Sequence, residues 1–173
     1  KFLLDQGYEV YGAYRRSSSP HAWRLRELGV EGRVRFIQFD LLEYSNIQSV
    51  VREIRPHEIY NLAAQSFVAN SFEQPLYTSD VDGLGVLRCL QVIRDTDPEI
   101  RFYQASTSEM FGKAQQSPQN ENTPFYPRSP YGCAKAYGFY ITRNYREAYG
   151  LFACNGILFN HESERRGENF VTR

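Results

Sequence analysis

Long apolar runs are missing from this sequence. No stretch approaches the roughly 20 apolar residues that a helix needs to cross a bilayer. The first residues, 1–7, also lack the long apolar core of a secretory signal peptide. We therefore expect a soluble protein that does not associate with a membrane.

Cysteines are few, and they are odd in number. Cys89, Cys133 and Cys154 are far apart, without a Cys-x-x-Cys pair or interleaved histidines. This spacing argues against a disulfide framework and against a zinc site. Free thiols are typical of a reducing compartment, so the sequence predicts a cytoplasmic protein without a bound metal.

An excess of charge of either sign is also absent, because 20 Lys and Arg residues balance 20 Asp and Glu residues. No net field would attract the whole molecule to nucleic acid or to an anionic membrane, so any anion site must be local. With 173 residues, 42% of them hydrophobic, the chain is long enough for one domain with its own core.

Strand-like and helix-like segments alternate along the chain. Strands are predicted at 8–14, 33–39, 58–64, 100–105 and 152–159, and helices at 23–28, 45–55, 77–94 and 130–149. Alternation of this kind favours an α/β fold, here a Rossmann-like, doubly wound parallel sheet. Ligands of such folds bind at the carboxyl ends of the strands, so functional residues should follow each strand directly.

The end of the strand at 8–14 is basic. Dinucleotide folds that select NAD place an Asp or Glu here, on the free ribose 2′-hydroxyl. Arg15 and Arg16, followed by serines, suit a ribose 2′-phosphate instead, because guanidinium groups offer paired donors and positive charge. An exposed basic turn is the alternative, but at this strand end we favour an NADP site.

Two further strand ends carry weaker signals. Asp40 is placed to accept a hydrogen bond from an adenine amino group while Leu41 packs on the ring, although Asp40 is equally suited to the N-terminus of the next helix. Small residues at 61–66 would let the backbone approach a ribose or phosphate closely, or would simply favour tight packing.

Tyr131 and Lys135 are four residues apart in a predicted helix, so their side chains project from one face. The Lys charge favours the phenolate of Tyr131, which can then remove a proton from a substrate hydroxyl. Such pairs are common on helix surfaces. The preceding strand strengthens the functional interpretation, because Thr107 and Glu109 follow it with a hydroxyl and a carboxylate, and Glu109 is suited to be an additional base.

Four strings resemble the GDP-mannose 4,6-dehydratase family of extended short-chain dehydrogenases/reductases: STSEMFG (106–112), TPFYPRSPY (123–131), NGILFNHES (155–163) and RRG (165–167). The resemblance covers nearly the whole chain. It implies conversion of GDP-mannose to GDP-4-keto-6-deoxymannose with NADP, in a homodimer or homotetramer. It also implies that Thr107, Glu109, Tyr131 and Lys135 are catalytic.

The same resemblance implies further binding residues. Ser66 and Asn160 would contact the sugar nucleotide. The residues expected at NADP are Arg15, Arg16, Asp40, Leu41, Leu62, Ala63, Ala64, Tyr77, Lys135, His161 and Arg166. The sequence departs from the family pattern at Phe67, Cys133 and Glu164, and Glu164 is expected to weaken a phosphate contact of the neighbouring arginines.

Residues 1–173 are therefore expected to be a partial NADP-binding Rossmann domain, without its first strand and glycine-rich turn and without most of the substrate domain. Residues 1–7 look like the last turns of a helix that closes at Gly7. A related nucleotide-sugar 4-epimerase, a GDP-4-keto-6-deoxymannose reductase and a non-catalytic NADP-binding protein remain as alternatives. The carboxylate of Glu109 favours the dehydratase over the epimerase and the reductase, and the presence of Thr107, Glu109, Tyr131 and Lys135 together argues against a non-catalytic protein.

Overall fold

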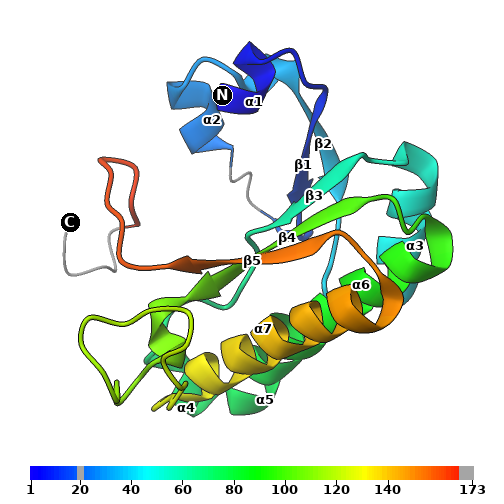
Figure 1. The fold of residues 1–173 in the computed structure, drawn as a ribbon. Coiled ribbons are helices and arrows are strands. Elements are labelled where there is room, and N and C mark those ends of the chain that lie inside the picture. Colours follow the sequence, from blue (N-terminus) through cyan, green and yellow to red (C-terminus); the bar gives the residue numbers. More distant parts are fainter. Residues whose placement is uncertain (19–21, 168–173) are drawn as a thin grey trace. The chain divides into compact units, whose positions relative to one another are not determined.

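A computed structural model describes residues 1–18 and 22–167 of the chain (Figure 1). Ser19, in the serine run after Arg15 and Arg16, lies outside the described residues. The chain divides into two compact units. Unit 1 is Lys1–Asp40 with Glu162–Arg173, and unit 2 is Leu41–His161.

Unit 1 holds a two-stranded parallel sheet. Strand β1 (Val10–Tyr14) pairs with β2 (Val34–Gln38), with Val10 opposite Val34. The other elements are α1 (Phe2–Asp5), α2 (Trp23–Glu27) and the 3₁₀ turn η1 (Glu31–Arg33). Gly7 follows α1 with a φ of 85°, which confirms the predicted left-handed closure.

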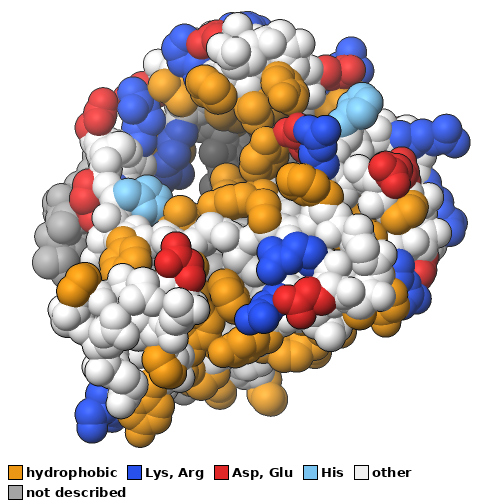
Figure 2. Space-filling view, viewed as in Figure 1, with side chains coloured by type: hydrophobic (Ala, Val, Ile, Leu, Met, Phe, Trp, Pro, Cys, Tyr) orange, Lys and Arg blue, Asp and Glu red, His pale blue; other side chains and the backbone are white. Residues whose placement is uncertain are grey.

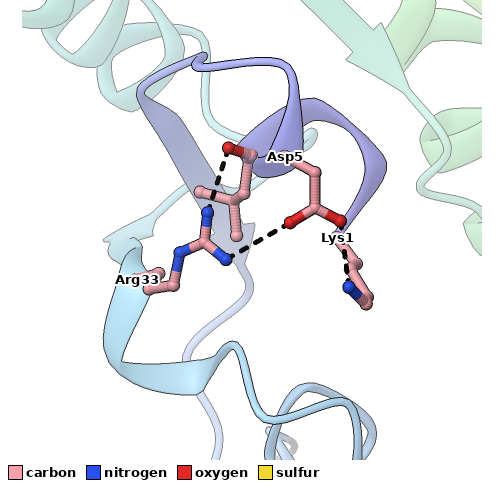
Figure 3. A network of polar contacts seen from close by, with 4 residues as sticks. Lys1, Asp5 and Arg33 are labelled. Atoms are coloured by element: carbon pink, nitrogen blue, oxygen red, sulfur yellow. Dashed lines mark hydrogen bonds and ion pairs between the residues drawn. The ribbon is translucent and has the colours of Figure 1, made fainter.

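A network of polar contacts joins the start of unit 1 to the residues before β2 (Figure 3). The carboxylate of Asp5 forms ion pairs with Lys1 at 2.9 Å and with Arg33 at 3.3 Å. Arg33 also donates a hydrogen bond to the carbonyl of Leu4 at 3.0 Å. The hydrogen bond from Lys1, and then that from Arg33, lower the pKa of Asp5. Because these groups are exposed, the network orients α1 more than it stabilises it.

Unit 2 contains the larger sheet, in the order β3-β4-β5. Its strands are β3 (Glu58–Asn61), β4 (Arg101–Thr107) and β5 (Ala153–Leu158), all parallel. Phe102 and Ala105 of the central strand are buried, as expected for a parallel strand that is covered on its faces. The strands thus end at one edge of the sheet, where β4 delivers Thr107 opposite Leu158 of β5.

Helices pack on this sheet and on one another. Helix α3 contacts α6, α6 contacts α7, and α7 lies on β4 and β5 (Figure 1). Their shared core is apolar and includes Ile47, Leu90, Ile93 and Phe102, each with no more than 1% of its surface exposed. The helical elements of unit 2 are α3 (Tyr44–Ile54), α4 (Asn70–Glu73), α5 (Pro75–Ser79), the π turn η2 (Asp80–Leu84), α6 (Gly85–Thr96), the 3₁₀ turn η3 (Ser108–Met110) and α7 (Pro130–Tyr149).

Helix α7 has the bounds that the sequence predicts. Ser129 is its N-cap and accepts a hydrogen bond from the backbone N–H of Gly132 at 3.0 Å, and Pro130 occupies the first helical position. Gly150 ends the helix in the left-handed region, with a φ of 70°. These local signals fix where the helix starts, and therefore where Tyr131 lies.

The predicted helix at 77–94 is present as one helical run made of α5, η2 and α6, in which η2 has π-helical rather than α-helical hydrogen bonding. Within this turn, a Cβ atom added to Gly83 would lie 3.2 Å from the ring of Tyr137 on α7. A Cβ atom added to Gly138 of α7 would lie 3.2 Å from the backbone oxygen of Asp82. Glycines on both elements thus allow a close approach that the hydrophobic pattern does not reveal. The short helix α4 was also not predicted.

The parallel strands belong to two sheets, β1-β2 and β3-β4-β5. Among residues 1–18 and 22–167, no helix is long and apolar enough to cross a membrane. Figure 2 shows basic and acidic side chains interspersed on the face in view, as expected from the equal numbers of the two charges.

Candidate functional site

Hydrogen bonds link the end of β4 to β5 and, through β5, to α7. Ser106, next to Thr107, donates to the side-chain oxygen of Asn155 on β5 at 3.1 Å. The amide of Asn155 in turn donates to the backbone oxygen of Phe139 on α7, also at 3.1 Å. The position of Thr107 relative to α7 is therefore fixed by side chains that are at least half-buried.

Thr107 then starts the turn that carries Glu109. Its hydroxyl oxygen accepts a hydrogen bond from the backbone N–H of Glu109 at 3.2 Å, which makes Thr107 the N-cap of η3. Glu109 itself is exposed. A carboxylate in this position can meet a ligand without any rearrangement of the backbone.

Tyr131, in the first turn of α7, is 8% exposed. Burial raises the pKa of its phenol, while a side-chain hydrogen bond with Thr107 opposes that shift by lowering the pKa. The phenol of Tyr131 is therefore close enough to the hydroxyl of Thr107 for that hydroxyl to affect its pKa. The charges of Asp82 and Glu109 raise the pKa of Tyr131 further.

Lys135 is buried below Tyr131, with 4% of its surface exposed. Its ammonium group lies 5.8 Å from the centre of the Tyr131 ring and donates a hydrogen bond to the carbonyl of Ala105 on β4 at 3.0 Å. Burial lowers the pKa of Lys135, and the charge of Asp82 raises it. Lys135 is therefore hydrogen-bonded to the backbone of β4, and the phenol ring of Tyr131 lies near it without such a bond.

Asp82 is the buried charged residue that sequence reasoning missed. It is 1% exposed, and one carboxylate oxygen accepts a hydrogen bond from the backbone N–H of Gln65 at 2.7 Å. Burial raises the pKa of Asp82 to about 6, although the Gln65 hydrogen bond and the Lys135 charge act in the opposite direction. The only sequence signal was an acidic residue directly between Val81 and Gly83.

The segment after β3 carries several of the predicted binding residues. Leu62, Ala63 and Ser66 are exposed and Ala64 is half-buried. Gln65 organises this segment, because its side chain accepts from the N–H of Phe67 at 2.8 Å and donates to Thr78 at 3.2 Å. The exposed backbone beside these small side chains suits close approach by a ligand.

The remaining predicted residues of unit 2 differ in their surroundings. Asn160 and His161 are exposed after β5, and His161 lies 2.9 Å from the carbonyl of Phe159. Tyr77 is half-buried on α5. Leu41 is only 6% exposed, and its side chain would lie 3.0 Å from a Cβ atom on Gly85, so its main role is to pack against α6.

Four predicted cofactor residues belong to unit 1. Arg15 and Arg16 are exposed after β1, and Asp40 is half-buried after β2. The helix after Asp40 begins at Tyr44 with Glu43 as its N-cap, so Asp40 does not occupy the cap position. Arg166 contacts Glu162 at 2.7 Å.

The arginines beside Glu164 are engaged by carboxylates of unit 1. Arg165 contacts Glu164 at 3.4 Å and Glu27 at 3.5 Å. These contacts reduce the positive charge that the segment offers to an anion. In the part of the chain that the structure describes, no three His, Cys, Asp or Glu side chains form a group able to hold a metal ion.

The sequence model of the family described as GDP-mannose 4,6 dehydratase matches residues 1–173. The chain belongs to this family. The GDP-mannose 4,6-dehydratase of Yersinia enterocolitica is 55% identical to it over 180 residues, which are 100% of this chain and 48% of that protein. The chain spans about half the length of the curated relatives it matches. The resemblance seen in the four sequence strings is confirmed.

Solved structures confirm the Rossmann-type fold. The UDP-Glc/GlcNAc 4-epimerase of Campylobacter jejuni has a TM-score of 0.79 at 20% identity, over 91% of this chain and 47% of that one. DesIV of Streptomyces venezuelae, a dTDP-glucose 4,6-dehydratase solved with NAD, has a TM-score of 0.74 at 25% identity, over 86% of this chain and 47% of that one. The fold is thus shared by epimerases and dehydratases and does not separate them.

Proposed function

We propose that this chain is the cofactor-binding part of an NADP-dependent GDP-mannose 4,6-dehydratase. The observation that carries the proposal is the convergence of Thr107, Glu109, Tyr131 and Lys135 where β4 ends against the start of α7. Family membership supports the same activity, since the relatives that match the whole chain carry this name.

Tyr131 is the base for the first step. It accepts the proton of the substrate 4-hydroxyl, and Thr107 hydrogen-bonds the same reacting hydroxyl. Because burial alone disfavours the phenolate, the hydroxyl of Thr107 and the positive charge of Lys135 are needed to favour it. The result of this step is a ketone at C4.

Glu109 is the base for the second step. The ketone acidifies the C5 proton, and the exposed carboxylate of Glu109 removes it and assists departure of the C6 hydroxyl as water. NADP bound beside these residues would supply the hydride chemistry at C4 and C6. The proton from C5 leaves with the C6 hydroxyl as water, and the proton taken up by Tyr131 balances the reprotonation of C5.

The residues present suit this cofactor. Arg15 and Arg16 expose two guanidinium groups after β1. Guanidinium groups at this strand end would bind the ribose 2′-phosphate, which NADP carries and NAD lacks. Leu62 and Ala63 are exposed and Ala64 is half-buried, which suits approach of a ribose or phosphate to this segment after β3. Asp40, Leu41, Tyr77, His161 and Arg166 complete the proposed set, although the buried side chain of Leu41 contributes mainly through packing.

Self-association is part of the proposal. The surface of α5, η2 and α7 exposes large apolar side chains, with Leu76 at 85%, Leu84 at 44%, Tyr137 at 41% and Tyr140 at 54%. Burial of such side chains against a second copy supports a homodimer or homotetramer.

A nucleotide-sugar 4-epimerase is the second candidate, because the likeness to the Campylobacter enzyme covers almost the whole chain. The two activities differ in their product. The full-length protein, incubated with GDP-mannose and NADP, should give a product that has lost one water by mass spectrometry, without net change in NADPH absorbance. A product of unchanged mass and altered C4 configuration would support the epimerase instead.

A further inference from the structure

Asp82 has one carboxylate oxygen with a hydrogen bond and one without. Oδ1 accepts from the N–H of Gln65, whereas Oδ2 is buried and has no hydrogen-bond partner. A buried carboxylate that lacks a full set of partners is costly, because burial removes the solvation of its charge. Neither step of the proposed reaction uses this residue.

The backbone around Asp82 is pressed against the part of α7 that carries Lys135. A Cβ atom on Gly138 would lie 3.2 Å from the carbonyl oxygen of Asp82, and one on Gly83 would lie 3.5 Å from that of Ala134. Ala134 and Gly138 lie on either side of Lys135 in the sequence. The π turn therefore brings a buried acid to the stretch of helix that holds a buried base.

Other charged and titratable groups near Asp82 are accounted for. On its own turn, Asp80 pairs with Arg88 of α6 at 2.6 Å, and this pair is partly exposed. Cys89 of α6 is buried, with a pKa raised to about 12, and is therefore neutral. The charges of Asp82 and of Glu109, on η3, both raise the pKa of Tyr131 on α7. Lys135 is the one buried cation among these groups.

We propose that Asp82 is a positioning residue whose buried carboxylate keeps the ammonium form of Lys135 in place beneath Tyr131. This rests on the proposed function in that Lys135 is taken as the catalytic lysine. The same carboxylate fixes the segment after β3 through Gln65, so one residue links the lysine to the segment that bears Ser66. No part of the π turn needs to touch the substrate for this role.

The physical need for such a residue comes from the surroundings of Lys135. Its ammonium donates a hydrogen bond to the carbonyl of Ala105 and is buried, with 4% of the residue exposed. Burial by itself would favour the neutral amine, which could not stabilise a phenolate. The Asp82 charge is the influence that raises the pKa of Lys135, and the effect is mutual because Lys135 lowers the pKa of Asp82.

The test is a titration of Lys135 in the full-length protein, labelled with ¹³C at the lysine ε carbon. A Lys135→Arg variant identifies the signal by its loss. In Asp82→Asn, which keeps the size of the side chain and an oxygen for Gln65, the midpoint of the Lys135 titration should move to lower pH. Asp80→Asn removes a carboxylate two residues away that already pairs with Arg88, and it should leave the midpoint unchanged.

A midpoint in Asp82→Asn equal to or above that of the wild type overturns the proposal. Should that variant fail to fold, Lys135→Met provides the reciprocal measurement, in which the carboxyl signal of Asp82 should titrate at higher pH than in the wild type. An unchanged Asp82 titration would then overturn it. Because neither titration requires turnover, a shift of the Lys135 midpoint in a protein that fails to dehydrate GDP-mannose would sink the proposed activity and leave this inference standing.

Discussion

Gly132 of α7 packs directly against the backbone of Glu109. A Cβ atom at Gly132 would lie 2.9 Å from the carbonyl oxygen of Glu109 and 3.0 Å from the side chain of Pro127. The glycine next to Tyr131 thus brings the helix that carries the proposed first base against the turn that carries the proposed second base. The spacing of the two bases depends on the absence of a side chain at this position.

Replacement of Gly132 by Ala should therefore separate the two segments. We expect a loss of about 1–3 kcal/mol in the free energy of unfolding, as for other overpacked sites, and a lower kcat. Gly32→Ala is the matched control, because a Cβ atom there meets no atom within 4 Å. Chemical denaturation and turnover of the full-length variants check both effects, and equal behaviour of the two variants would contradict the account.

The N-cap of α7 should contribute measurably to stability. Ser129→Ala removes the hydroxyl that accepts the N–H of Gly132, and such losses typically cost about 1 kcal/mol. Ser45→Ala, at an exposed position inside α3, should change the stability by less than about 0.5 kcal/mol. Urea denaturation distinguishes the two. A Ser129 variant as stable as the wild type would show that the cap does not fix the helix start.

The three thiols should differ in reactivity. Cys133 is exposed on α7, whereas Cys89 is buried, and burial raises the pKa of the Cys89 thiol to about 12. Since the thiolate is the reactive form, alkylation at pH 8 should modify Cys133 first and leave Cys89 intact in the folded protein. Peptide mass spectrometry after timed iodoacetamide treatment measures this. Modification of Cys89 at the rate of Cys133 would argue against the packing of α6.

Cofactor choice should depend on the arginines after β1. The double variant Arg15→Ala with Arg16→Ala removes two exposed guanidinium groups that are suited to a 2′-phosphate. In the full-length enzyme we expect binding of NADP to weaken much more than binding of NAD, because only NADP carries this phosphate. Titration calorimetry with both dinucleotides provides the comparison, and equal losses for the two would refute the assignment.

The sequence predicts most where local signals determine structure. Ser129, Pro130 and Gly150 mark the ends of α7, and the predicted and observed bounds agree. The order of strands and helices follows from hydrophobic periodicity in the same way. The sequence also places Thr107, Glu109, Tyr131 and Lys135 near one another, because strand ends and helix starts meet at one edge of a parallel sheet.

Tertiary packing accounts for what the sequence does not reveal. The helical pattern at 77–94 gives no sign of the π turn, which packs closely against α7 at glycines on both elements. Nothing in this pattern marks Asp82 as buried, and its burial is visible only in the structure. Similarly, the expected contact of Lys135 with Tyr131 did not suggest that the ammonium would donate to the carbonyl of Ala105.

The central claim is a division of labour between Tyr131 and Glu109, and the most direct test follows the cofactor during a single turnover of the full-length enzyme. Glu109→Gln retains size and hydrogen bonding but loses the base, which typically costs about 10²–10⁴-fold in rate. With GDP-mannose it should accumulate NADPH absorbance with little dehydrated product, whereas Tyr131→Phe should not reduce NADP at all. Product formation by Glu109→Gln at the wild-type rate would contradict the account.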